Sequence, residues 1–462
     1  MNTVLKVFQL DLRSLALGRI FLGVIVVVDL LFSFARRHQY YTELGMFPRA
    51  SVPLIDSMEH SFSLYFALSW TGFTSFLLIL SILIAVCFTL GYQTKWSSRL
   101  IWLAVLFLQE RNRFVLIGGD SWLRVALFWF MFLPVGEYFS LDRNAEPEKT
   151  RYQIVANAAS FGLVMQAVYI YLWAGMAKFG DDWWQGKAVY YVLQGDEFGY
   201  GLAQYALYFP KLLYWSSVIV PYLEIAAALA LIVPWKHKYF RAFGVVSLIC
   251  LHLGIWCTME LYHFSAICIA LLVSLAPSFV WRGKDEKRGP FEFPKGLSVF
   301  MIVLTFFTWI YNPYRIYRED KLNRNLHLMA EFVGAQQLWQ LFAPVAPKST
   351  FIIYAVAELD DGTLQHLSYR GNKRERAPGP NDPEFEVRLS RYWRSLVESH
   401  SQSVAFHAHA AWFARLWQRL YPDQAQNLVA MHLYYQTYNV APNYEDLPPE
   451  APTLVAEYKL PR

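Results

Sequence analysis

Charged residues are scarce in this chain, since only 17% of its 462 residues are Asp, Glu, Lys or Arg and the net charge is +5. Charges so few and so scattered do not form the broad basic surface typical of nucleic-acid binding, so we expect no nucleic-acid partner. Cysteine is also rare, and its four residues all fall inside apolar runs. They predict buried free thiols rather than a disulfide framework, and neither a CxxC pair nor a zinc spacing occurs.

Motifs that mark several enzyme classes are missing as well. The sequence contains no nucleophilic elbow, phosphate-binding loop or dinucleotide-binding glycine pattern. His407-Ala-His409 resembles a metal-binding tract only superficially, because no further ligands accompany it, so the sequence predicts no metal. The first apolar run is long and ends at Arg36-Arg37-His38 without a small-residue cleavage site, so we expect it to remain as a signal anchor.

Apolar residues dominate instead: 55% of the chain is hydrophobic and 18% is aromatic, which is typical of membrane proteins with aromatic belts. The apolar segments are 16–35, 66–91, 98–109, 121–138, 154–177, 212–234, 240–258, 263–281 and 296–312. The third is short, and 98–138 could instead be one broken hairpin. The sequence therefore predicts a polytopic α-helical membrane protein with about eight or nine transmembrane helices in residues 1–312.

The remaining residues, 313–462, are more polar and predict a small α+β extramembrane domain. We expect strands at Phe351–Leu359, Leu364–Tyr369 and Met431–Tyr438, helices at Arg388–His400 and His409–Tyr421, a flexible loop at Arg374–Pro383 and a frayed end at Tyr458–Arg462. Lysine and arginine are enriched in alternate loops, which places the N-terminus in the cytoplasm and the C-terminal domain outside. We expect a bacterial inner membrane protein with a periplasmic C-terminal domain.

Lys178 is the most informative candidate for chemistry, because it directly follows the apolar run Ile154–Met176. An amine at that depth must be desolvated, reach the interface or find a partner, and desolvation favours the uncharged form that can act as a base. Trp183 and Trp184 lie nearby, so Lys178 could also be an ordinary interfacial anchor.

Other polar residues lie inside or at the ends of the apolar segments. The candidates for substrate binding are Asn112, Arg113, Asp120, Arg124, Trp183, Glu224, His252 and His263. Glu224 has apolar neighbours on both sides, so its carboxyl must be protonated or paired, and a helix-packing hydrogen bond would explain it equally well. A single buried histidine such as His252 is more often structural than a ligand. Arg19 and Asp29 can reach the interface from the ends of the first segment.

Several segments together resemble the HTTM family, the transmembrane domain shared by vitamin K-dependent γ-glutamyl carboxylase and bacterial homologues. The segments are Asp11–Asp29, Tyr40–Pro48, Gly118–Arg124, Phe128–Asp142, Ala174–Lys178 followed by Asp182, Trp183 and Gly186, residues 250–280, Trp339–Pro344 and Asp360–Gly362. The resemblance implies that Lys178 is the base toward a reduced quinone of the vitamin K or menaquinone type. It also implies O2 and CO2 as co-substrates, quinone epoxide as product and a secreted peptide or protein that is modified at the outer face.

The sequence departs from the family pattern at several points. The first lysine of the family's lysine pair is Ala177, a histidine that follows asparagine is Arg113, and the cysteine pair and the long C-terminal extension of the animal enzyme are missing. An alternative function is therefore a non-enzymatic membrane maturation or export factor for a secreted peptide. A transporter is a third interpretation, but no pair of matching broken helices is visible.

Overall fold

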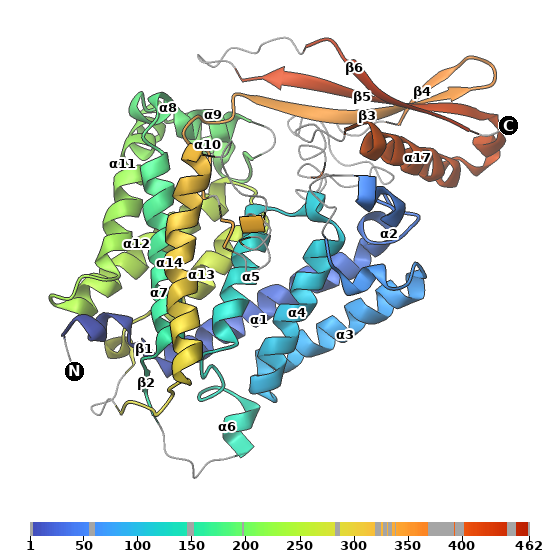
Figure 1. Cartoon of the computed structure of the whole chain (residues 1–462). Coiled ribbons are helices and arrows are strands. Elements are labelled where there is room, and N and C mark those ends of the chain that lie inside the picture. Colours follow the sequence, from blue (N-terminus) through green and yellow to red (C-terminus); the bar gives the residue numbers. More distant parts are fainter. Residues whose placement is uncertain are drawn as a thin grey trace.

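The structure is a computed structural model that places a bundle of long helices beside a four-stranded sheet (Figure 1). It describes residues 3–54, 61–145, 152–195, 198–281, 287–318, 325–326, 330, 335–337, 339–367, 392, 402–440 and 450–460. The sheet lies across the end of the bundle at which α8, α9 and α10 are found, and the N-terminus lies near the opposite end. We call the end that carries the sheet the sheet end.

Among the residues that the structure describes, six helices are long and apolar enough to cross a membrane. They are α1 (Leu12–Ala35), α3 (Thr71–Leu90), α7 (Ala158–Ala177), α11 (Pro210–Ala230), α12 (His237–Thr258) and α14 (Lys295–Arg318). Three further predicted segments form shorter helices, namely α4 (Thr94–Arg111), α5 (Gly118–Phe130) and α13 (Phe264–Ser274). The prediction of a polytopic helical membrane protein is confirmed. Within residues 98–138 the chain is helical in α4 and again in α5, and the break between the two helices contains the turn Arg113–Val115.

Short elements complete the bundle. The helices are α2 (Arg37–Tyr40), α6 (Leu141–Ala145), α8 (Asp181–Trp184), α9 (Ala188–Gln194) and α10 (Ala203–Ala206), and the 3-10 turns are η1 (Thr3–Phe8), η2 (Arg49–Leu54), η4 (Leu64–Phe66), η5 (Arg113–Val115) and η6 (Ser278–Val280). Strands β1 (Leu10–Asp11) and β2 (Ile154–Val155) pair antiparallel, which joins the start of α1 to the segment before α7.

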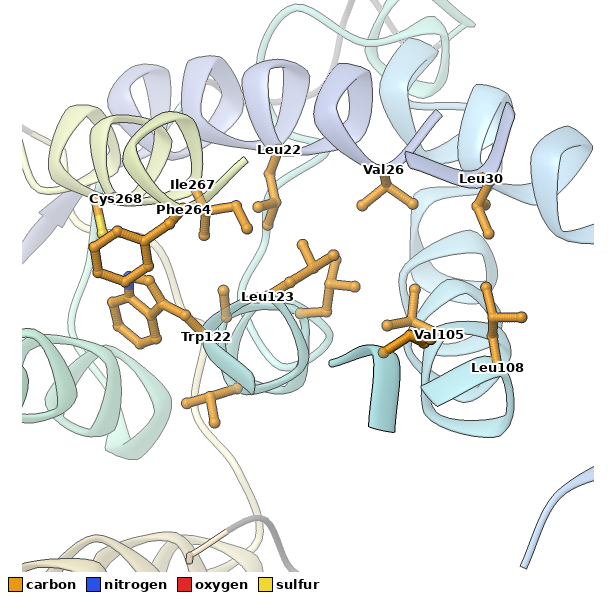
Figure 2. Packing of buried hydrophobic residues seen from close by; sticks show 14 of the residues in the cluster. Leu22, Val26, Leu30, Val105, Leu108, Trp122, Leu123, Phe264, Ile267 and Cys268 are labelled. Carbon is orange, nitrogen blue, oxygen red and sulfur yellow. The ribbon is translucent and has the colours of Figure 1, made fainter. Parts of the chain in front are cut away.

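Figure 2 shows part of the buried core of the bundle, to which α1, α4, α5 and α13 contribute. Leu22 on α1 lies near Ile267 on α13, and Leu123 on α5 lies below them, whereas Val105 on α4 faces the other end of α1. Buried apolar side chains from four helices thus exclude water from the centre of the bundle. Outward-facing residues such as Val28 on α1 are exposed in the isolated chain, as expected for helices that contact lipid.

Two predictions about buried and exposed groups in the bundle are wrong. Arg19 does not reach the interface: it is fully buried, and its Nη2 donates to the carbonyl of Phe139 at 2.5 Å. Of the four cysteines only Cys268 is buried, and Cys250 and Cys257 are exposed on the surface of α12. A thiol is apolar enough to face lipid, so an apolar run alone does not separate lipid-facing from core positions.

The C-terminal region is an α+β unit, as predicted. Its sheet has the strand order β4-β3-β5-β6, with neighbouring strands antiparallel. The elements are β3 (Ser349–Leu359), β4 (Leu364–Leu367), α17 (Gln402–Leu420), η8 (Pro422–Asn427), β5 (Leu428–Asn439) and β6 (Thr453–Lys459). The predicted frayed end at 458–462 is wrong up to Lys459, because β6 pairs with β5. The predicted helix 388–400, apart from Tyr392, and the predicted loop 374–383 lie outside the described residues.

Candidate functional site

Lys178 ends α7 at the sheet end of the bundle and is buried, with 4% of its surface exposed. Its Nζ donates to Oε2 of Glu224 on α11 at 2.8 Å and to the carbonyl oxygen of Ala174 at 3.2 Å. The ring of Trp183 lies beneath the amine, with its centroid 5.4 Å from Nζ. Lys178 is therefore not an interfacial anchor in water but one partner of a buried ion pair.

Close packing of α7 against α11 makes this pair possible. A Cβ added at Gly175 would lie 2.7 Å from the carbonyl oxygen of Pro221 and 3.3 Å from Cβ of Glu224. Only glycine fits at such a separation, so Gly175 allows the two helix backbones to approach. The segment Ala174–Lys178 thus contains both Gly175, which lets α7 approach α11, and Lys178, which pairs with Glu224 on α11.

A second buried polar pair lies on the same side of α7. Tyr171 precedes Lys178 by seven residues and therefore lies on the same helix face. Its hydroxyl is 2.9 Å from Nε2 of His252 on α12, and both residues are buried. Lys178 is close enough to His252, and Glu224 to Tyr171, to interact electrostatically. We call these four residues, Lys178, Glu224, Tyr171 and His252, the lysine cluster.

The Asp182-Trp183 motif holds residues 342–348, which lead to the sheet, beside this cluster. Trp183 Nε1 donates to the carbonyl of Phe342 at 3.0 Å, and Asp182 accepts a hydrogen bond from the backbone of Ala346 at 3.2 Å. Asp182 also pairs with Lys348 at 2.9 Å, and this hydrogen bond raises the pKa of Lys348. Trp183 is thus a wall of the site and a docking point for residues 342–348.

Glycine supports this docking too. A Cβ at Gly180 would collide with the carbonyl oxygen of Pro344. The two sequence motifs Gly180–Trp183 and Trp339–Pro344 are therefore in contact, although they lie far apart in the chain. This contact lies beside Lys178, because Trp183 takes part in it and the centroid of its ring is 5.4 Å from Nζ.

Three predicted residues belong to a separate group around the end of α4. Asn112 donates to the carbonyl of Tyr40 at 3.0 Å and accepts from the backbone of Phe114, so it shapes the turn after α4. Arg113 and Arg124 both form ion pairs with Glu110, the latter at 2.9 Å. Arg124 also lines a small cavity with Gln166 and Gln337. The structure assigns these residues to local ion pairs and turns rather than to the lysine cluster.

Asp120 and His263 meet at a third place, where the start of α5 packs against the start of α13. The distance between His263 Nε2 and Asp120 Oδ1 is 3.4 Å. Sequence reasoning placed both among the candidates but did not pair them.

Sequence reasoning missed Tyr171 of the lysine cluster, and it also missed Glu110, the acidic partner of Arg113 and Arg124 outside that cluster. The spacing of seven residues before Lys178 is the signal that could have identified Tyr171, because it places a hydroxyl on the lysine face of the helix. Glu110 directly precedes Arg111 at the end of an apolar run, and its two arginine partners could not be inferred from that position. Lys178, Glu224 and His252, which the sequence suggested one by one, lie together in the lysine cluster.

The family of HTTM domains matches residues 8–281, which is more than half of the chain. No curated protein and no solved structure matches the chain. The matched region contains the whole lysine cluster, and it ends before α14 and the C-terminal sheet.

Proposed function

Because the chain belongs to the HTTM family, which it shares with γ-glutamyl carboxylase, we propose that it is a membrane enzyme that oxidises a reduced quinone to its epoxide and thereby modifies a secreted peptide or protein. Lys178 is the base in this proposal. The observation that carries it is the burial of an amine beside a carboxylate at the end of α7, 2.8 Å apart. Addition of CO2 to a peptide glutamate is the form of modification that the resemblance implies.

Glu224 gives Lys178 a way to become uncharged. A buried carboxylate and ammonium at hydrogen-bond distance share one proton. A low-dielectric setting reduces the free-energy difference between the ion pair and the neutral pair of amine and carboxylic acid. When the proton resides on Glu224, the amine has a free electron pair for the phenolic proton of the hydroquinone. Removal of that proton starts the reaction with O2. The amine becomes an ammonium whose charge is balanced by the hydroquinone anion, because Glu224 keeps the proton that it took up.

The surroundings suit such chemistry. The isoprenoid tail of a quinone would lie in lipid, while residues 342–348, which Asp182 and Trp183 hold beside Lys178, would limit the access of water. Tyr171 and His252 supply a hydroxyl and an imidazole on the lysine-bearing face of α7, where they would bind a quinone oxygen by hydrogen bonds. In this proposal the sheet end faces the periplasm, so that a secreted substrate reaches the site from the C-terminal domain.

The experiment is an epoxidation assay on the full chain in detergent micelles, with reduced menaquinone and reduced vitamin K, O2, CO2 and candidate secreted peptides. Lys178→Ala is expected to lower epoxide formation by about a thousandfold or more, as loss of a proton-transfer group commonly does. Lys187→Ala is the matched control, because Lys187 follows closely in the chain and is exposed. Wild-type epoxide formation by Lys178→Ala protein would refute the proposal.

The alternative, a non-enzymatic maturation or export factor, makes the opposite prediction. Processing of the client would survive Lys178→Ala and would be lost when residues 320–462 are deleted. The two functions are therefore separated by a single pair of variants assayed with the same client.

A further inference from the structure

Three buried ligand-type side chains from three helices converge at a place that the proposed function does not use. Asp29 lies in the last two turns of α1, Asp120 in the first turn of α5, and His263 directly before α13. Their exposed fractions are 7%, 1% and 9%. One carboxylate oxygen of each aspartate and one ring nitrogen of the histidine all lie within 4.8 Å of one another. We call these residues the aspartate–histidine cluster.

The local backbone holds this cluster in place. A Cβ at Gly119 would lie 3.2 Å from the backbone of Phe264, so this glycine lets the start of α5 approach the start of α13. Asp120 Oδ2 accepts a hydrogen bond from the backbone of Ile117, which fixes the carboxylate and leaves Oδ1 3.4 Å from His263. Tyr262 donates to Asp29 Oδ1 at 3.1 Å and orients the second carboxylate. Such supporting contacts are typical of the residues around metal ligands.

The imidazole of His263 provides an independent indication of a ligand. Neither of its ring nitrogens forms a hydrogen bond within the part of the chain that the structure describes, although the side chain is nine-tenths buried. The Oε1 atom of Gln109 is also buried without a hydrogen-bond partner among the described residues. Its Nε2 atom donates to the backbone carbonyl of Asp120 at 2.9 Å, so the amide lies beside the cluster. A buried polar group without a partner indicates a bound water or ion.

We propose that Asp29, Asp120 and His263 bind a first-row divalent cation, Zn²⁺ or Mn²⁺. Ligand atoms around one such ion, with bonds of about 2.0 to 2.2 Å, lie about 3 to 4.4 Å apart, so small side-chain movements would close the site. Two carboxylates balance the charge of a dication, which offsets the cost of burying them. The imidazole favours Zn²⁺ or Mn²⁺ over Ca²⁺ and Mg²⁺, which take oxygen ligands.

The test measures metal binding rather than activity, so its outcome is distinguishable from that of the quinone assay. Full-length protein in detergent, stripped with a chelator, is titrated with ZnCl2 and with MnCl2 and then analysed by mass spectrometry for bound metal. We expect about one ion per chain for the wild type, with an affinity lowered at least about tenfold in Asp29→Asn and His263→Gln. Asp423→Asn and His407→Gln are matched controls at exposed positions and should bind as the wild type does.

The proposal would be overturned if neither Zn²⁺ nor Mn²⁺ bound to the wild type. It would also be overturned if both site variants bound the ion as tightly as the wild type does. A second measurement covers the case in which a site variant does not fold. X-ray absorption at the zinc edge of the loaded wild type should show one imidazole and carboxylate oxygens in the first shell. A shell without imidazole would contradict the assignment.

Discussion

The side chain of Lys178 on α7 and that of Glu224 on α11 form a buried ion pair, with Nζ 2.8 Å from Oε2. The partners are 46 residues apart in the chain and are brought together by the close approach of two apolar helices at Gly175. Each ion alone would be costly in this setting, so each explains the presence of the other.

The first prediction concerns the stability of this pair. Glu224→Gln leaves the ammonium without its counter-charge and should lower the free energy of unfolding by about 3 to 5 kcal/mol. The double variant Lys178→Met, Glu224→Leu removes both charges and should recover much of that loss, while it stays inactive in epoxide formation. Thermal unfolding in detergent measures the difference. The single variants Lys178→Met and Glu224→Leu are measured alongside. If the loss of stability in the double variant equals the sum of the losses in these two, the two residues do not interact.

The second prediction tests the packing at Gly175. Gly175→Ala places a methyl group 2.7 Å from the carbonyl oxygen of Pro221, so α7 and α11 must separate, at a cost of about 1 to 3 kcal/mol. Separation also lengthens the Lys178–Glu224 contact, and epoxide formation should fall. Gly254→Ala is the matched control, because no atom lies within 4 Å of its added Cβ on α12. Equal behaviour of the two alanine variants would contradict the close approach.

The third prediction separates two adjacent tryptophans. Trp183 is 4% exposed and donates to Phe342, whereas Trp184 is 50% exposed. Trp183→Ala should destabilise the site by about 3 to 5 kcal/mol and release residues 342–348 from the bundle. Limited proteolysis of the full chain should then cut between the helical bundle and the sheet. Trp184→Ala should leave the cleavage pattern unchanged, and faster cleavage in both variants would refute the specific role of Trp183.

The fourth prediction is a pH dependence in the C-terminal domain. His409 on α17 is buried against Tyr392, Trp412 and Phe413, and desolvation lowers its pKa from 6.5 to about 3. The unfolded chain binds a proton at this residue below pH 6.5 and the folded chain does not. Stability from the neutral histidine is therefore fully present above pH 6.5 and decreases as the pH falls from there toward about 3.

The measurement is tryptophan fluorescence of the full chain during acid titration. His409→Phe keeps an aromatic ring in the pocket and should make the domain less sensitive to pH in that range. The exposed His407 is the control, because His407→Phe removes a histidine that is not buried. An acid transition that is identical in the wild type and in His409→Phe would exclude His409 as its cause.

The C-terminal strands illustrate how far local patterns reach. The β-branched and aromatic residues of β3 and β5 are a local signal, so both strands were predicted close to their observed bounds. Strand β6 was not predicted, and its last two residues were placed in a frayed end at Tyr458–Arg462. The strand is held by its pairing with β5, a long-range contact that no local pattern reveals. Likewise, the short helices α5 and α13 were predicted as longer spans, since an apolar run does not reveal where a helix stops.

The membrane bundle could be determined from the sequence by itself, because transfer of an apolar segment into lipid depends on that segment alone. The sequence also marked Lys178 as a candidate, since a lysine at the end of an apolar run needs a partner or the interface. The partners of its polar residues were decided only by tertiary structure. Glu224 reaches Lys178, and Asp29 reaches His263, only after helices distant in the chain have packed. The physical reason is that an ionisable residue within an apolar run must be paired when it is buried, which the sequence shows. The packing of the helices determines which residue becomes its partner.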